Sequence, residues 1–145
     1  MIYFDSAYIA KFYFEEPDSE AVTALAADSG RVHSSVLGKL EVSSVFHRKL
    51  REGAIDARIQ RVLERQFDRD CAHGLWLWLP VTPALIDQAR STFSRTSKRH
   101  FLRSADALHL VSAREHGFKE IYSSDRHMLA AAPLFGLRGV TAGSP

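Results

Sequence analysis

Cysteine is almost absent from the chain, with Cys71 alone among 145 residues. No disulfide can form within one copy, which is typical of proteins from a reducing compartment, so we expect a cytoplasmic location. Cys71 and His73 have the spacing of half a zinc site. No second pair of Cys or His residues at ligand spacing accompanies them, and the sequence therefore argues against bound zinc.

Long apolar runs are missing as well. No uncharged apolar stretch approaches the roughly 18 residues that a membrane-spanning helix needs. Asp5 interrupts the apolar amino-terminal segment, and no basic residues precede it as they would in a signal peptide. We therefore expect no association with a membrane. An excess of one charge is also absent, because 19 Lys and Arg against 17 Asp and Glu leave a net charge of only +2.

Several motifs of phosphate chemistry are absent too. The chain has no GxxxxGK[ST] loop and no GxGxxG turn after its first apolar segment. The residues Asp5, Ser6 and Ala7 do not form the DxD pattern of a nucleophilic aspartate, and no GxSxG elbow occurs. These absences argue against P-loop NTPases, dinucleotide-binding enzymes, aspartyl phosphatases and α/β-hydrolases.

The chain does contain a regular alternation of short apolar segments and amphipathic ones, which is typical of a parallel sheet with helices on both faces. Its length suits one domain, so we expect a single α/β domain over residues 1–145. The expected strands are residues 2–4, 31–34, 75–81, 119–122 and 137–140. The expected helices are residues 7–16, 19–29, 34–53, 54–71, 84–96, 101–113 and 126–132. In the helix at 54–71, the pattern places Ile59, Val62 and Phe67 toward the core.

An acid lies on the apolar face of the helix expected at residues 101–113. Asp106 shares that face with Leu102, Leu110 and Ala113. Burying an unpartnered carboxylate is costly, so a metal, a cation or a hydrogen-bonded cap should compensate its charge. The structural alternative is that Asp106 lies in the first turn, where the helix dipole favours an acid.

Three more acids have similar settings. Asp5 and Asp125 each follow an apolar strand and precede a helix. Functional groups collect at such strand ends in open α/β sheets, although helix N-capping is an equal explanation. Glu41 lies in the apolar stripe of its helix, and its structural alternative is a salt bridge to Lys39, Arg48 or a neighbouring helix.

If the four acids converge, they require cations. Two unit charges about 4 Å apart repel by roughly 4 kcal/mol at an effective dielectric constant near 20. A cluster of four would therefore take up protons or bind a divalent metal, and a set of oxygen ligands alone favours Mg²⁺ or Mn²⁺. Such a site can activate water and stabilise a phosphate under attack. The sequence thus points to metal-dependent phosphodiester hydrolysis.

Basic residues gather directly before the Asp106 helix. A run of charged residues is most often a solvated surface. Here, however, contacts between these basic residues and phosphates would hold a polyanion near the acids. The candidate RNA-binding residues are Arg95, Lys98, Arg99 and Arg103. Trp76 and Trp78 alternate with leucine and share one face of their strand, which fits the core or a protein contact better than a base-stacking platform.

Four segments resemble a known family in order and spacing. They are FDSAYIAKFYFEEPDSEAV, SSVLGKLEVSSVFHRKL, LRSADALHLVSA and IYSSDRHMLAAA. They are similar to the acidic segments of PIN domains, and most of all to those of the VapC-like toxin ribonucleases of bacterial toxin–antitoxin pairs. The resemblance covers residues 2 to about 140. It implies a three-layer α/β/α sandwich with a mainly parallel sheet and an Mg²⁺- or Mn²⁺-dependent endoribonuclease site.

The resemblance also implies residue roles and partners. By position, Asp5 and Asp106 bind the metal, while Glu41 and Asp125 complete the site and orient the attacking water. Ser123 matches the small hydroxyl residue two positions before the last acid, and Ser6 is a weaker, adjacent candidate. The implied partners are an RNA substrate, a small antitoxin and a second copy in a homodimer. Two alternatives stay open: a non-catalytic RNA- or partner-binding module, and a housekeeping nuclease of this fold without an antitoxin.

Overall fold

The structure is a computed structural model in which residues 1–143 are described. Its strands are β1 (Ile2–Tyr3), β2 (Val32–Ser35), β3 (Trp76–Leu79), β4 (Glu120–Tyr122) and β5 (Arg138–Val140). Strands β1, β2 and β3 form one parallel sheet, and β4 and β5 form a parallel pair. A parallel bridge between Phe4 and Tyr122 joins the two, so the strand order across the molecule is β3-β2-β1-β4-β5.

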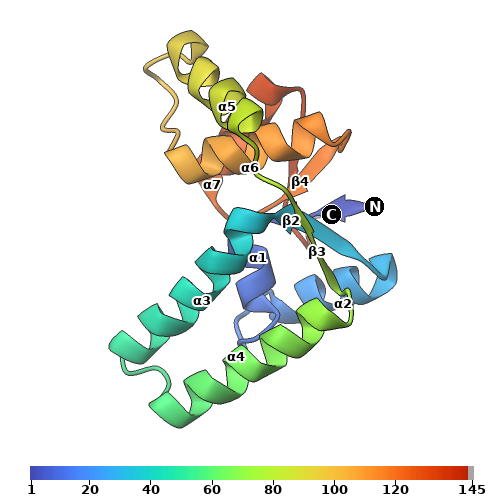
Figure 1. The fold of residues 1–145 in the computed structure, drawn as a ribbon, viewed down its shortest axis with the longest axis vertical. Helices are drawn as coiled ribbons and strands as arrows, with labels where there is room; N and C mark the ends of the chain where they lie inside the picture. Colours follow the sequence, from blue (N-terminus) through green and yellow to red (C-terminus); the bar gives the residue numbers. More distant parts are fainter. Residues whose placement is uncertain (144–145) are drawn as a thin grey trace.

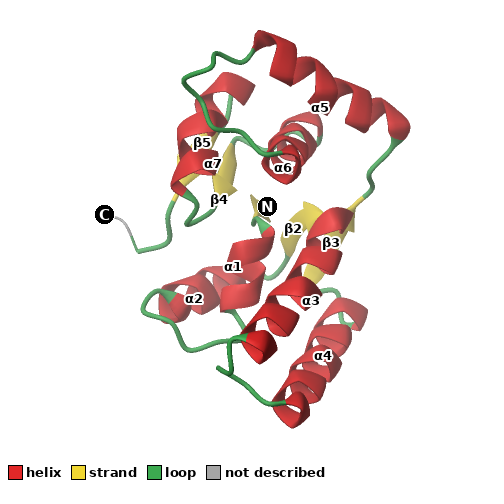
Figure 2. Ribbon diagram, turned by 90° about the vertical axis from the view of Figure 1, so that its left-hand side faces the viewer, coloured by secondary structure: helices red, strands yellow, loops and turns green. Residues whose placement is uncertain are grey.

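Helices cover both faces of these strands (Figures 1 and 2). The helices are α1 (Ser6–Lys11), α2 (Ser19–Ser29), α3 (Val36–Arg51), α4 (Ala57–Ala72), α5 (Pro83–Arg95), α6 (Ser104–Glu115) and α7 (Arg126–Ala131), followed by a 3₁₀ turn at Ala132–Phe135. Helices α1 to α4 lie on one side of the strands, and α5 and α6 lie on the other (Figure 2). The predicted α/β/α sandwich with a parallel sheet is confirmed.

Adjacent residues of the first strand enter different cores, as the alternation of side chains along a strand requires. Tyr3 packs in the core formed with α5, α6 and α7, beside Leu110 and Phe118. Phe4 packs in the core formed with α1 to α4. The next residue, Asp5, therefore leaves the sheet at its centre, between the two layers of helices.

Several helix boundaries differ from those expected, and two of the differences have a clear physical cause. Helix α1 ends at Lys11 and not at residue 16, because Tyr13 enters an aromatic cluster with Phe46, Phe67 and Trp76 from an irregular turn. Helix α6 begins at Ser104 and not at residue 101, so Asp106 does lie in its first turn. In both places tertiary packing and loop geometry override the local helical pattern.

The prediction of which α4 residues point toward the core is partly wrong. Phe67 is buried, but Ile59 and Val62 are exposed. Trp76 is buried in the α1 to α4 core, where its Nε1 donates to the Tyr13 hydroxyl, and Trp78 packs against Phe67. No helix within residues 1–143 has the length and apolar content needed to span a bilayer.

Candidate active site

The strand order changes direction between β1 and β4, and the residues that follow these two strands meet there. From β1 the chain proceeds outward to β2 and β3, whereas β4 and β5 lie on the opposite side of β1. Crevices at such switch points are the usual binding sites of open α/β sheets. Asp5 follows β1 and Ser123 to Asp125 follow β4, so the topology brings the first and last predicted acids together.

Asp5 is the most deeply buried of the four acids, with 3% of its surface exposed. It caps α1, and its Oδ1 accepts the Tyr8 N–H at 2.9 Å. Its Oδ2 accepts a hydrogen bond from the Ser123 hydroxyl. Burial raises the pKa of the Asp5 carboxyl to about 6, although the hydrogen bonds from Ser123 and Tyr8 oppose the shift. The capping explanation for Asp5 is thus correct, and it uses only one of the two carboxylate oxygens.

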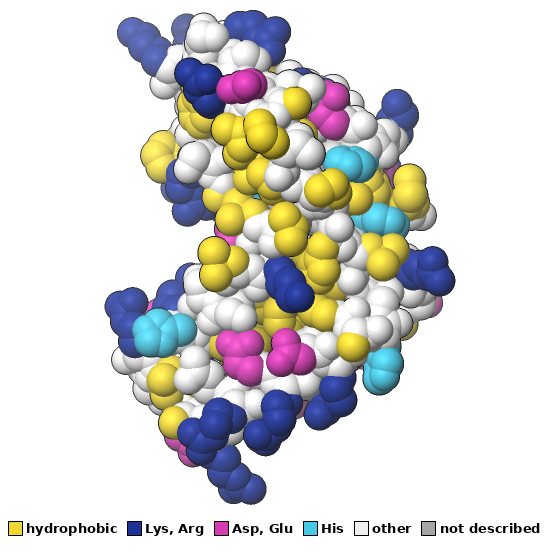
Figure 3. All heavy atoms as spheres, viewed as in Figure 1, with side chains coloured by type: hydrophobic (Ala, Val, Ile, Leu, Met, Phe, Trp, Pro, Cys, Tyr) yellow, Lys and Arg dark blue, Asp and Glu magenta, His cyan; other side chains and the backbone are white. Residues whose placement is uncertain are grey.

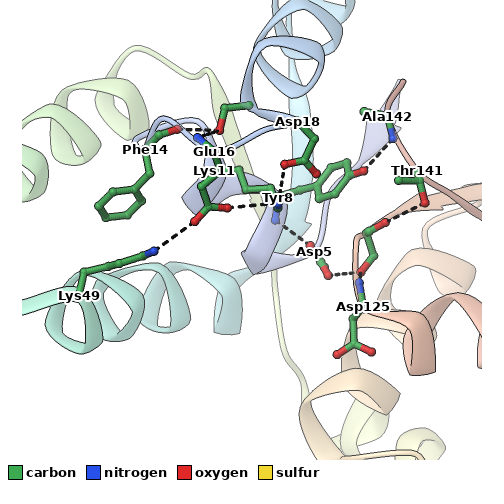
Figure 4. Close-up of polar contacts among 12 residues, drawn as sticks. Asp5, Tyr8, Lys11, Phe14, Glu16, Asp18, Lys49, Asp125, Thr141 and Ala142 are labelled. Atoms are coloured by element: carbon green, nitrogen blue, oxygen red, sulfur yellow. Dashed lines mark hydrogen bonds and ion pairs between the residues drawn. The ribbon is translucent and has the colours of Figure 1, made fainter. Parts of the chain in front are cut away.

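Ser123 connects two of the acids. Its hydroxyl donates to Asp5 and accepts the backbone N–H of Asp125 at 2.9 Å. Asp125 in turn caps α7, where its Oδ1 accepts the N–H groups of His127 and Met128 at 2.8 and 3.2 Å. Asp5 and Asp125 lie close together at the end of the strands, joined by these contacts (Figure 4). At Asp125, as at Asp5, one carboxylate oxygen accepts the hydrogen bonds of the helix cap. The other oxygen contacts a different side chain, which is Arg103 at Asp125 and Ser123 at Asp5.

Asp106 and Asp125 are bridged by an arginine. The Arg103 Nε lies 3.0 Å from Asp106 Oδ2, and its Nη2 lies 2.6 Å from Asp125 Oδ2. Asp106 is 5% exposed, whereas the Arg103 side chain is 56% exposed. The hydrogen bond to Asp106 and the negative charges of Asp106, Asp125 and Glu41 raise the pKa of Arg103. Arg103 is therefore the cation that compensates these acids in this structure.

Glu41 approaches the same region from α3. Its Oε1 lies 2.7 Å from Nε2 of His109, a buried residue of α6 one turn after Asp106. Of the three structural alternatives predicted for Glu41, the neighbouring helix is the one that provides the partner, and neither Lys39 nor Arg48 does. The charge of Glu41 acts on Asp5 in the direction that raises the pKa of Asp5, so these two acids also share one electrostatic environment.

The donor set fits a hard divalent cation in its chemistry. All four acids supply carboxylate oxygens, and Asp5 is held at a raised pKa that a bound dication would relieve. The side-chain arrangement is not yet that of a metal site: within residues 1–143, no three His, Cys, Asp or Glu side chains are grouped closely enough to hold an ion. A metal shared by Asp106 and Asp125 requires Arg103 to withdraw, which its solvent exposure permits.

The comparisons with known proteins agree with this topology. The family model of the PIN domain matches residues 2–133. The chain belongs to the PIN-domain family. A search of curated protein sequences found no match for this PIN domain.

Solved structures similar to this PIN domain have low sequence identity and nearly complete overlap. Mycobacterium tuberculosis VapC20, a toxin that cleaves the sarcin–ricin loop, aligns with a TM-score of 0.71 and 18% identity over 90% of this chain and 95% of its own. FitAcB from Neisseria gonorrhoeae aligns with a TM-score of 0.69 and 21% identity over 96% of each chain. FitAB bound to an IR36 DNA fragment gives a TM-score of 0.69 and 19% identity over 97% of this chain and 94% of its own. At these identities the similarity establishes the fold.

A groove of this PIN domain lies beside Glu41. It encloses about 420 Å³ between α1 and α3, with Glu41 and Ser124 at its lining together with Lys11, Phe14 and Arg48. At its outer part Glu16, which also lines the groove, pairs with Lys11 and Lys49, and Asp18 pairs with Lys11 (Figure 4). Those outer acids are neutralised by lysines and have a structural role.

The predicted basic group divides in two. Arg95 ends α5, and Lys98 and Arg99 are exposed in the loop that follows it. Arg103 instead contacts the acids. The space-filling view shows Lys and Arg side chains around α5, above a hollow in one side of the molecule (Figure 3). Contact of these residues with RNA stays a prediction.

Sequence reasoning did not assign a role to Tyr3 or His109. The Tyr3 hydroxyl lies 2.9 Å from His109 Nδ1, so that the two residues connect the first strand to Glu41. One signal was available. His109 is a polar residue within an otherwise apolar helical run, three residues after Asp106 and hence on the same face.

Proposed function

We propose that this PIN domain is a metal-dependent endoribonuclease, and that it is the toxin of a toxin–antitoxin pair. The observation that supports the proposal is a set of contacts at the strand switch: Ser123 connects Asp5 to Asp125, and Arg103 bridges Asp125 and Asp106. Membership in the PIN-domain family supports the same reading.

Asp5 and Asp106 would hold Mg²⁺ or Mn²⁺, with Asp125 and Glu41 completing the site. When bound, the ion would lower the pKa of a water and stabilise charge on the scissile phosphate. The chain itself positions the acids: Ser123 orients Asp5, the α7 cap orients Asp125, and His109 orients Glu41. Arg103, once released from the acids, can bind a phosphate oxygen of the substrate.

The substrate proposal is RNA, bound as a single strand along the groove between α1 and α3. Phosphates would contact the basic loop formed by Arg95, Lys98 and Arg99, which supplies charge without reading sequence. The similarity to VapC20, named as a toxin that cleaves an RNA loop, supports an RNA substrate. The whole chain would act as one cytoplasmic PIN-like domain.

Two protein partners are proposed. An apolar pocket of about 310 Å³ between α3 and α5 is lined by Leu37, Ile86, Phe93 and Leu108, and Val36 and Leu40 are exposed beside it on α3. Such a surface suits a second copy in a homodimer. An antitoxin would cover the acids or the exposed Ile59 and Val62 of α4. The FitAcB and FitAB similarities are consistent with an assembly of this kind.

The Arg103 bridge favours a second candidate, a PIN-like module that binds RNA or a partner without cutting. In that case the arginine would keep the acids neutralised, and a metal would not enter. A housekeeping PIN nuclease without an antitoxin shares the site of the first candidate and differs in having no inhibitor. A short reading frame beside the gene would distinguish those two.

The experiment is an RNA cleavage assay with purified protein, in Mg²⁺ or Mn²⁺ and then in chelator. We expect new RNA ends in the presence of metal only, and their loss in Asp106→Asn. The control is Asp87→Asn, which removes an exposed acid of α5 paired only with Arg90. Cleavage that survives chelation, or that Asp106→Asn leaves intact, contradicts the proposal. RNA binding without cleavage supports the second candidate.

A further inference from the structure

A series of hydrogen bonds through three buried polar groups ends at Glu41. The Ser35 backbone N–H, at the start of α3, donates to the Tyr3 hydroxyl at 3.0 Å. The Tyr3 hydroxyl lies 2.9 Å from His109 Nδ1, and His109 Nε2 lies 2.7 Å from Glu41 Oε1. Tyr3 and His109 are fully buried, whereas the Glu41 side chain is 28% exposed. This series of hydrogen bonds therefore runs from the sheet to the solvent-facing edge of the site.

For a neutral His109 ring, the chemistry of these groups gives each hydrogen bond one direction. A backbone N–H can only donate, so the Tyr3 oxygen accepts from Ser35 and its own proton must go to another group. Among the described residues, the acceptor at hydrogen-bonding distance is His109 Nδ1; the buried Ser34 and Ser112 hydroxyls also lie near the Tyr3 oxygen and act to lower the pKa of Tyr3, as donors to that oxygen do. Nδ1 then carries no proton. The ring proton lies on Nε2 and is donated to the Glu41 carboxylate, which accepts.

The burial of Tyr3 is consistent with this direction, and the packing at Gly38 explains how His109 reaches Glu41. Burial raises the pKa of the Tyr3 hydroxyl, so Tyr3 keeps the proton that it donates. Helices α3 and α6 also approach closely at Gly38, one turn before Glu41. A Cβ there would lie 2.9 Å from Ser34 Oγ and 3.5 Å from His109 Cε1. The close approach of the helices is what allows a histidine of α6 to reach a glutamate of α3.

We propose that Tyr3 and His109 form a buried relay that positions the Glu41 carboxylate relative to Asp106, and that both are positioning residues of the site. The inference rests on the proposed function, because Glu41 matters only if the acids act together. His109 and Asp106 lie on the same face of α6, three residues apart, so a carboxylate fixed by His109 is fixed relative to Asp106. Hydrogen-bonded partners of metal-binding carboxylates and histidines have a comparable orienting effect, and their loss typically costs about 10- to 100-fold in affinity or activity.

The first test measures the histidine tautomer in metal-free wild-type protein by ¹⁵N–¹H NMR, with the signals of His109 assigned by their loss in His109→Gln. We expect the proton on Nε2 and none on Nδ1. In Tyr3→Phe, which lacks the donor, the Nε2 preference should weaken. A proton on Nδ1 in the wild type overturns the relay. This measurement requires neither metal nor RNA, so its result is separate from the success or failure of the nuclease proposal.

The second test measures Mn²⁺ affinity by calorimetry. Tyr3→Phe should weaken binding about tenfold or more. The matched control is Tyr13→Phe, because the partly buried Tyr13 hydroxyl is also held between two partners, Trp76 Nε1 and Asp70 Oδ2, against the core on the other face of the sheet. The control should leave Mn²⁺ affinity unchanged. Equal effects of the two variants would assign Tyr3 a stabilising role only and overturn the proposal.

A pair of substitutions at His109 separates hydrogen bonding from packing. His109→Gln keeps an N–H that can reach Glu41 and should retain most of the Mn²⁺ affinity. His109→Leu fills the space without a donor and should lose it about tenfold or more. Equal affinities of the two variants would contradict the relay. If wild-type protein binds Mn²⁺ in this pattern but leaves RNA intact, the nuclease proposal fails while the relay stands.

Discussion

Arg103 Nη2 lies 2.6 Å from Asp125 Oδ2, while the Nε of the same guanidinium lies 3.0 Å from Asp106. Arg103 and Asp125 are 22 positions apart in the chain, and one positive charge thus contacts both acids. The arginine occupies the place where a shared dication would neutralise the same two carboxylates. A metal bound by these oxygens would therefore compete with Arg103.

Replacing Arg103 should strengthen metal binding. Each ion pair with a solvent-exposed partner contributes roughly 0.2 to 1 kcal/mol, so removal of the two pairs predicts Mn²⁺ affinity about two- to thirtyfold higher in Arg103→Gln. Isothermal titration calorimetry measures this directly. The control is Arg99→Gln, which removes the same charge from the exposed loop nearby. Unchanged or weaker affinity in Arg103→Gln, relative to this control, would show that the arginine does not compete with the metal.

The raised pKa of Asp5 predicts a pH-dependent cost to stability in metal-free protein. The native carboxyl titrates near pH 6 and the unfolded one near its ordinary value of 3.8. Between these values the native state binds more protons than the unfolded state, so the free energy of unfolding falls as the pH rises from about 4 to about 6. The difference of about two pKa units corresponds to a loss on the order of 3 kcal/mol, which persists at higher pH.

Asp5→Asn removes this titration and keeps an oxygen for the helix cap. In chelator, urea unfolding should show Asp5→Asn more stable than wild type at pH 8 and nearly equal to it at pH 4. Added Mn²⁺ should stabilise the wild type more than the variant. A variant that is less stable at pH 8, or a difference that does not change with pH, would rule out burial as the dominant influence on Asp5.

Ser123 should affect activity through the orientation of Asp5. Ser123→Ala deletes the donor to Asp5 and the acceptor of the Asp125 N–H, so we expect RNA cleavage to fall about 10- to 100-fold. Ser123→Thr keeps the hydroxyl and should retain most of the activity. The measurement is the cleavage rate at saturating RNA and metal. Ser123→Ala with wild-type rates would remove Ser123 from the site.

The basic loop should contribute to RNA affinity without dependence on sequence. The triple change of Arg95, Lys98 and Arg99 to glutamine removes three charges, which predicts a decrease of about 2 in the slope of log affinity against log salt for single-stranded RNA. Binding is measured by fluorescence anisotropy in chelator, so that the RNA is not cut.

The matched control for that experiment is on α4. Arg58, Arg61 and Arg65 are also exposed, and their change to glutamine removes the same charge from a different surface. The slope should then remain close to that of the wild type. If both triple variants lose the same slope, net charge alone accounts for binding and the loop has no special part in it.

The sequence was sufficient to predict the fold and the proximity of Asp5 to Asp125, for reasons of topology. Asp5 and Asp125 each follow a strand, and parallel strands bring their carboxyl ends to one edge. Glu41 and Asp106 stood out because each is an acidic residue within an apolar helical stripe. These patterns depend on local spacing, which a single sequence displays. Their roles in metal binding stay predictions.

Contacts between distant segments were not predictable in the same way. The Tyr3 to His109 to Glu41 chain joins three segments, and its register depends on the approach of α3 to α6 at Gly38. The position of Arg103 depends on where α6 begins, which is three residues later than the helical pattern indicated. Long side chains at loop–helix boundaries reach partners that no periodicity specifies.

The most direct test of the central claim is a crystal of the wild-type protein soaked in Mn²⁺, with anomalous scattering measured to locate the ion. We predict an anomalous peak bound by the oxygens of Asp5 and Asp106, with the Arg103 side chain displaced from Asp125. A peak elsewhere, or no peak with Arg103 still bridging Asp106 and Asp125, would contradict a shared metal site.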